Sequence, residues 1–201
     1  MKKIIAGVLA LTLISCFVPF NNNTTDKYTV YAQGEKAEYT EGDYGYLKYR
    51  NYGDYIVISG CHTSAVAIEI PSEIDGVAVT SIGKSAFFYC ESLTSVTIPD
   101  SVTSIGSYAF SGCEALTSIT IPDSVTTIGW STFHSCKSLT SVTIPNSVTI
   151  ISNNAFAGCE ALTSVTIETP NCEIYDSAYT ISNSDENFTG TIYGYENSTA
   201  Q

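Results

Sequence analysis

The sequence is short of basic residues. Only 8 lysines and arginines stand against 20 aspartates and glutamates in 201 residues, which gives a formal net charge of −12. Beyond Arg50, Lys84 and Lys137 are the only positively charged side chains. Such an acidic chain repels phosphate backbones and anionic lipid headgroups. We therefore expect no binding to nucleic acid and no electrostatic binding to membrane surfaces.

The residues that usually carry catalysis are also scarce. Only His62 and His134 titrate near neutral pH by nature, and the acidic residues are scattered over predicted loops with no marked acid–base pair. Closely spaced cysteine pairs of the kind that hold zinc are absent. His134 and Cys136 lack the context of a nucleophile and its base. The sequence predicts a protein that is not an enzyme, with no catalytic residues, metal site or cofactor.

Long hydrophobic runs are missing except at the N-terminus. After Lys2 and Lys3, residues 4–20 are almost uninterruptedly apolar, and a polar stretch follows. This order is that of a secretory signal, and the apolar run is short for a membrane-spanning helix. We predict a signal peptide over residues 1–32, with cleavage after Ala32. No second hydrophobic segment follows, so no integral membrane domain is expected.

A lipoprotein signal is the alternative for the N-terminus. The segment LISC, residues 13–16, resembles a bacterial lipobox in which Cys16 would carry the lipid. The apolar run continues to Phe20 beyond this cysteine, which favours cleavage after Ala32. Both alternatives predict an exported protein, either secreted or held at the cell surface.

The region after the signal is rich in tyrosine: eight of the 14 tyrosines lie within residues 28–55. Residues 33–43 are polar and are expected to form a loose linker. Residues 44–60 alternate apolar and polar side chains around an Asn/Gly/Asp turn, which predicts a β-hairpin. We predict that residues 33–64 are a linker and hairpin cap whose tyrosine rings cover the end of a core. A carbohydrate-stacking platform is the other role for these rings.

A repeat of 23 residues fills most of the remaining chain. Complete copies with the pattern L-T-S-V-T-I-P-x-S-V-T-x-I-G-x-x-A-F-x-x-C run over residues 93–115, 116–138 and 139–161. A longer copy precedes them and a decayed copy begins at Leu162. A fixed period of this size indicates a solenoid, in which stacked coils build one continuous core. We predict the solenoid over residues 65–184 and a trailing segment over residues 185–201.

Each copy contains two short extended segments and a turn. The first segment alternates β-branched and small polar residues, which predicts a strand with one buried face, and a proline ends it. The residues expected to face inward in one copy are Val96, Ile98, Val102, Ile105, Ala109 and Phe110. The predicted fold is a β-dominated leucine-rich-repeat solenoid of short parallel strands, with tight helical or 3₁₀ turns and an N-terminal β-hairpin cap.

One cysteine recurs in each copy. Four of them are spaced by 23 residues: Cys90, Cys113, Cys136 and Cys159. Stacking would place them in a column with a rise of about 4.8 Å, within reach of disulfide formation. Their position beside phenylalanine and leucine favours small buried thiols over disulfides, and both over a metal site. Cys61 and Cys172 fall in the irregular end coils, and the sequence leaves their redox state open.

The repeat LTSVTIPDSVTSIGSYAFSGCEA, residues 93–115, resembles the BspA-type leucine-rich repeat, and the resemblance covers Ala65 to about Ser184. It implies a bacterial secreted or surface protein that binds proteins, cells or polymers. The family shares no catalytic residues. In such relatives the trailing segment runs on and further modules follow, including cellulosomal dockerins. The resemblance therefore implies that the chain is a fragment or stops early at Gln201.

Two surfaces are candidates for binding. The variable turn carries Tyr108 and Trp130 at adjacent positions of adjacent copies, with Lys84, Phe88 and His134 in the same turns. Exposed aromatics are frequent anchors for partners, so Trp130, Tyr108 and His134 are the predicted binding residues. The other surface is the strand face, where serine and threonine columns offer hydroxyl groups. Hydroxyl side chains suit any exposed strand, which favours a structural role for that face over polysaccharide or ice binding.

The sequence supports two functions. The first is a secreted or cell-surface adhesion module, not catalytic, that binds an extracellular protein or glycan. The second is a structural spacer in a larger extracellular protein, with a possible place in a cellulosome. A hydrolase is disfavoured by the scarcity of catalytic side chains. Neither the ligand nor the oligomeric state follows from the residues.

Overall fold

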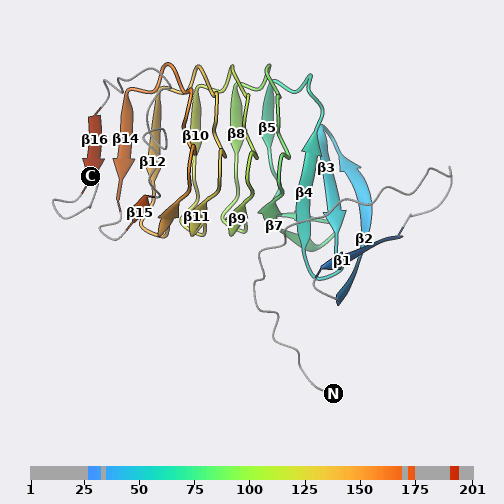
Figure 1. The fold of residues 1–201 in the computed structure, drawn as a ribbon. Coiled ribbons are helices and arrows are strands. Elements are labelled where there is room, and N and C mark those ends of the chain that lie inside the picture. The colour runs from blue at the N-terminus through green and yellow to red at the C-terminus, as the bar shows by residue number, and fades with distance from the viewer. Residues whose placement is uncertain (1–26, 33–34, 169–171, 175–190, 195–201) are drawn as a thin grey trace.

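The computed structural model describes residues 27–32, 35–168, 172–174 and 191–194. In these residues the chain is a β-solenoid of about five coils with an N-terminal β-cap, and it contains no helix (Figure 1). Two rows of short parallel strands run along the solenoid, and each coil contributes one strand to each row. The predicted parallel-stranded leucine-rich-repeat solenoid is confirmed.

The first sheet has six strands in the order β16-β14-β12-β10-β8-β5. They are β5 (Ala67–Glu69), β8 (Ser95–Thr97), β10 (Ser118–Thr120), β12 (Ser141–Ile144), β14 (Ser164–Ile167) and β16 (Thr191–Gly194). Equivalent residues pair in register, such as Ser118 with Ser141. Each 23-residue copy thus adds one strand to the sheet, and equivalent side chains of successive copies lie in a column.

The second sheet has ten strands, nine of them in the order β1-β2-β3-β4-β7-β9-β11-β13-β15, while β6 pairs with β7 only. The coil strands are β6 (Glu73–Ile74), β7 (Val77–Ile82), β9 (Ser104–Ile105), β11 (Thr127–Ile128), β13 (Ile150–Ile151) and β15 (Glu173–Ile174). The cap strands are β1 (Lys27–Ala32), β2 (Glu35–Tyr44), β3 (Leu47–Asn51) and β4 (Ile56–Cys61).

The cap continues the second sheet. The predicted hairpin is present as β3 and β4, and β4 then pairs in parallel with β7. Residues 35–43, expected to be a loose linker, instead form most of β2, because their backbone pairs with β3 on one side and β1 on the other. Strand β1 lies inside the predicted signal peptide, so cleavage after Ala32 would remove it. Residues 1–26, the rest of that segment, lie outside the described residues.

The core is one continuous stack of side chains from successive coils. The six side chains predicted to face inward in the copy 93–115 are all buried, with at most 8% exposure. Phenylalanines occupy its centre in a parallel stack, with ring centroids 4.9–5.5 Å apart and planes within 10°: Phe87, Phe110, Phe133 and Phe156. Offset parallel rings add attraction to the apolar area that they bury.

The turns that close the coils differ from the prediction, because none is helical. Each holds two left-handed residues four positions apart: Ser85 and Tyr89, Tyr108 and Gly112, Ser131 and Ser135, Asn154 and Gly158. Left-handed residues interrupt a right-handed helix. Alternate amides donate to the next coil instead, as Phe87 N–H does to the Ala109 carbonyl at 2.7 Å. The turns are therefore a third hydrogen-bonded ladder between coils.

The cysteine column forms in the core. The thiols of Cys113, Cys136 and Cys159 each donate to a phenylalanine carbonyl of the preceding coil, at 3.0–3.2 Å. All six described cysteines are free thiols. The Cys61 thiol differs, because it donates to the carbonyl of the next residue, His62, at 3.1 Å. Its interaction with Cys90 raises the pKa of Cys61 and lowers the pKa of Cys90. The thiols of Cys113, Cys136 and Cys159 therefore each link one coil to the one before it.

Burial of these thiols predicts a loss of stability at alkaline pH. Desolvation raises the pKa of Cys113 from 9.0 to about 12. Above pH 9 the unfolded chain releases this proton while the folded chain keeps it, so the free energy of unfolding falls as pH rises towards 12. Between pH 9.5 and 11, Cys113→Ala is expected to flatten that fall by about 1.4 kcal/mol per pH unit. Urea unfolding of the parent chain and the variant at several pH values measures how the free energy of unfolding depends on pH in each. Equal slopes would contradict a raised pKa of Cys113.

Candidate functional site

Four aromatic side chains form a continuous row over three coils, here named the aromatic ridge: Phe88, Tyr89, Tyr108 and Trp130. They come from the turns that follow β7, β9 and β11. The centroids of Tyr108 and Trp130 are 5.1 Å apart, those of Phe88 and Tyr108 6.2 Å, and those of Phe88 and Tyr89 4.5 Å. The Tyr108 N–H also donates to the Trp130 carbonyl at 3.0 Å. Stacking of the turns thus aligns residues that are far apart in the sequence.

The ridge is exposed to solvent. Phe88 is 45% exposed, Tyr89 54% and Trp130 49%, whereas Tyr108 is half-buried between its neighbours. By contrast, the phenylalanine of each coil's core is fully buried. Contiguous exposed apolar side chains usually mark a surface that contacts a partner. The ridge is therefore the strongest candidate for a binding surface among the described residues.

Two ridge tyrosines have strained backbones. Tyr89 has a φ of 54° and Tyr108 a φ of 59°. The left-handed region is costly for bulky side chains and favours glycine and asparagine. The other coils carry glycine or asparagine at three of the six equivalent positions, Gly112, Gly158 and Asn154, and the small residue serine at the other three. Folding alone would favour smaller residues at both tyrosine positions.

Charged side chains lie beside the ridge, since Lys84 and Glu91 are exposed on either side of Phe88 and Tyr89 in the chain. Lys137 and Glu114 form an ion pair between neighbouring coils, with an Nζ–Oε1 distance of 2.7 Å. Glycine at position 112 leaves room for the Tyr89 ring, since a Cβ atom there would lie 2.9 Å from Tyr89 Cδ1. A partner would accordingly meet aromatic rings with charged side chains beside them.

Of the three predicted binding residues, the structure brings two together. Trp130 and Tyr108 are in ring contact, whereas His134 makes no ring contact with either, and its Nδ1 lies 2.8 Å from Ser135 Oγ. Tyr89 was not predicted. It could have been found by the comparison that singled out Trp130, because other coils carry small residues at its position.

The strand face has a structural explanation for part of its hydroxyl groups. The threonines that precede β10, β12 and β14, such as Thr117 and Thr163, donate to a threonine carbonyl of the preceding coil at 3.3–3.4 Å. Serine and threonine at the outward positions of β8 and β10 are exposed, as predicted. No aromatic or charged side chain interrupts the outward positions of these two strands. This face offers less to a partner than the ridge does.

Among the described residues, no three histidine, cysteine, aspartate or glutamate side chains gather in a way that could hold a metal ion. The described residues also include no helix that is long and apolar enough to cross a membrane.

Comparisons with known proteins agree with the repeat and its fold. Residues 60–187 match the model of the BspA type leucine rich repeat region in six copies. A leucine rich cell surface protein from Faecalibacterium prausnitzii A2-165 superposes with a TM-score of 0.65 at 29% identity, over 77% of this chain and 39% of that one. The chain thus spans less than half of that protein.

Two further solved structures share the architecture. The T. pallidum Leucine Rich Repeat protein gives a TM-score of 0.52 at 25% identity, over 77% of this chain and 86% of that one. A leucine-rich repeat protein from Bacteroides capillosus ATCC 29799 gives 0.55 at 23% identity, over 77% and 97%, which is a likeness of fold alone. Among curated proteins, none matches the chain.

Proposed function

Since this chain belongs to the BspA-type leucine-rich repeat family, we propose that it is a non-catalytic binding module, secreted or held at the cell surface, whose aromatic ridge anchors an extracellular partner. Export is supported by the sequence of the N-terminus. The first structural neighbour is described as a cell surface protein, which agrees with this location. The solenoid supplies a rigid support, and the variable turns supply the contact residues.

The observation that carries the proposal is the pair of tyrosines at left-handed positions. Backbone strain that persists at exposed positions points to a role outside folding. Tyr89 and Tyr108 keep large rings where Gly112 and Asn154 would relieve the strain, and both rings belong to the ridge. A binding role for the ridge accounts for the presence of tyrosine at both positions.

The ring geometry favours a protein partner over a glycan. Sugar rings stack best on broad flat aromatic surfaces, but neighbouring ridge rings meet at 60° to 88°. Such a stepped surface suits the irregular side chains of a protein, for which tryptophan and tyrosine are frequent anchors.

Variants of the ridge on an array of purified extracellular-matrix proteins and polysaccharides test this proposal. We expect the full chain to bind a protein on the array, and Trp130→Ala to weaken that binding by about tenfold or more. Ser141→Ala, on the exposed strand face, is the matched control and should bind as before. Unchanged binding by Trp130→Ala would contradict the role of the ridge.

Tyr108→Asn separates binding from stability. Relief of the left-handed tyrosine is worth about 1 kcal/mol, and the lost ring contacts with Trp130 and Phe88 cost about the same. The free energy of unfolding is therefore expected to change by less than about 1 kcal/mol while binding falls. Urea unfolding and the same array measure the two effects. A folded variant that binds normally would show that the tyrosine has no part in recognition.

A structural spacer within a larger surface protein is the second candidate. It is favoured by the length of the Faecalibacterium protein, of which the matched region covers 39%. A spacer needs no ligand of its own. Failure of the full chain to bind any protein or polysaccharide on the array would therefore favour this alternative.

A further inference from the structure

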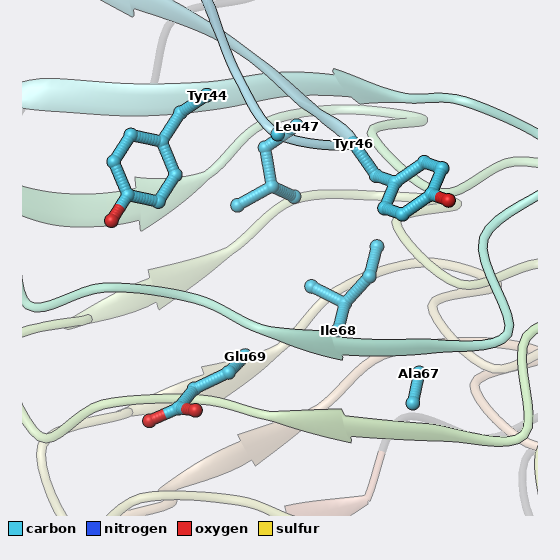
Figure 2. Close-up of a pocket in the computed structure, with 7 residues that line it drawn as sticks. Tyr44, Tyr46, Leu47, Ala67, Ile68 and Glu69 are labelled. Atoms are coloured by element: carbon cyan, nitrogen blue, oxygen red, sulfur yellow. The ribbon is translucent and has the colours of Figure 1, made fainter.

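A shallow pocket of about 190 Å³ lies at the capped end of the solenoid, and none of the ridge residues lines it (Figure 2). Its upper wall is formed by residues 44–47, which are the last residue of β2, the turn and the first residue of β3, and its lower wall is β5, residues 67–69. Figure 2 shows Tyr44 and Tyr46 on either side of Leu47, which points towards Ile68. Leu47 and Ile68 are buried and close the bottom of the pocket.

Strand β5 is an open edge of its sheet. The cap extends the second sheet through β4 but adds no strand to the first, so within the described residues β5 pairs only with β8. The Val66 carbonyl and the Ile70 N–H bond towards β8, to Thr94 and Thr97 respectively. Alternate residues of a strand direct their backbone groups to opposite sides. The N–H and C=O groups of Ala67 and Glu69 therefore point into the pocket.

Exposed apolar groups surround this open edge. Tyr44 is 49% exposed, Tyr46 54% and Val66 56%. These three belong to only seven large hydrophobic side chains that are exposed in the described residues. A strand that presents free backbone groups beside apolar side chains is a template for pairing with another segment. The edge thus combines backbone donors and acceptors with an apolar wall.

The charge of the edge indicates which segment would pair with it. Glu69 is the only charged side chain that lines the pocket, and it is exposed. The whole chain carries a net charge of −12, so a second copy of this chain would meet repulsion. A basic side chain placed beside Glu69 on a paired strand would instead be attracted.

We propose that the β5 edge and its pocket bind an extended cationic polypeptide segment, which adds a strand to the six-stranded sheet. The added strand would lie about 4.8 Å from β5 and bond to Ala67 and Glu69. Its apolar side chains would contact Leu47 and Tyr46, and its basic side chains would lie beside Glu69. This site is independent of the aromatic ridge and of any ligand bound there.

The amidated heptapeptide Lys-Val-Lys-Val-Lys-Val-Lys, with a fluorophore acylated to its N-terminus, is the probe. Binding is measured by fluorescence anisotropy, and amide hydrogen exchange of the full chain locates it. In the free chain the Ala67 and Glu69 amides should exchange rapidly, and the peptide should slow both. Two N-methylated peptides, one modified at every valine and one at every lysine, test strand pairing. In a paired strand the N–H groups of either the valines or the lysines face β5, but not both. We therefore expect only one of the two peptides to lose binding.

Two protein variants address the backbone and the charge separately. Ala67→Pro removes an N–H that points away from β8 and leaves the bonds to β8 in place. Edge strands accept proline at such positions. It should weaken peptide binding by about tenfold or more. Glu69→Lys should weaken it by a few-fold, and more at low salt than at high salt. Asp123→Lys makes the same change of charge at an exposed corner of another coil and should have a smaller effect.

Several results would overturn the proposal. They are absence of binding at millimolar peptide, equal binding of both N-methylated peptides, and equal losses in Glu69→Lys and Asp123→Lys. Protection of the β5 amides by self-association of the chain would assign the edge to a second copy instead. If Ala67→Pro does not fold in a thermal unfolding control, the N-methylated peptides and Glu69→Lys still decide the matter.

Discussion

Replacing Phe110 by alanine is expected to lower the free energy of unfolding by about 3–5 kcal/mol. Phe110 is fully buried, and its ring lies between those of Phe87 and Phe133, at centroid distances of 4.9 and 5.5 Å. Alanine would leave a cavity in the middle of the stack and remove both ring contacts. Because coils are stabilised by their neighbours, the loss affects two interfaces at once. Urea unfolding followed by circular dichroism measures it.

Two comparisons make this prediction specific. Phe110→Leu keeps most of the buried volume and should cost clearly less than the alanine variant. Thr120→Ala, at an exposed outward position of β10, should change stability by less than about 0.5 kcal/mol. A cost below about 1 kcal/mol for Phe110→Ala would show that the stack is not the main support of the core.

Gly106→Ala should also be strongly destabilising, by about 3 kcal/mol. A Cβ atom at Gly106 would lie 2.6 Å from Lys84 N and 2.8 Å from Gly83 C. Both are backbone atoms of the preceding coil, so relief requires the coils to move apart and weakens the ladders between them. The φ angle of Gly106 is not in the left-handed region, so the close approach, and not backbone freedom, requires glycine.

The next coil provides the matched control. A Cβ atom at Gly129, the equivalent position, would have its nearest contacts at 3.2 Å from Ser107 N and 3.3 Å from Thr132 Oγ1. In the coil after that, Ser152 already carries a side chain there. Gly129→Ala is therefore expected to cost less than about 1 kcal/mol. Equal thermal shifts for Gly106→Ala and Gly129→Ala would contradict the steric explanation.

The stacked core could be predicted from the sequence because its signals repeat. Val96, Ile98, Val102, Ile105, Ala109 and Phe110 were all expected to face inward, and all are buried. A residue that recurs every 23 positions must occupy the same place in each coil, so several copies support each assignment. The cysteine column was predicted in the same way. The hydrogen bond from the Cys113 thiol to the Phe87 carbonyl gives a reason for a weakly polar side chain at this buried position.

The turns could not be predicted from the same pattern. Their left-handed positions carry serine, tyrosine, asparagine or glycine, and no single residue type marks them. Alternate N–H groups bond to the next coil, as from Tyr89 N–H to the Ser111 carbonyl, while those between them bond three residues back within the turn. Local sequence therefore suggested a helical turn, whereas contacts between coils decide the conformation.

The candidate sites depended even more on contacts between coils. Trp130 and Tyr108 stood out because they vary between copies, and the stacking of turns places them together. Tyr89 and the wall of the end pocket were missed, since pairing of β4 with β7 decides which edge of β5 stays open. No motif in the residues of β5 marks that edge.

The in-register columns have an evolutionary consequence. Recombination between the nearly identical repeats would add or remove whole coils, and each remaining column would still be continuous. Loss of residues 116–138, for example, would join two copies without disturbing the phenylalanine or cysteine positions. The ridge would lose Trp130 in the same event. Length can thus vary in such a lineage at little cost to the fold, while the set of exposed side chains changes with every step.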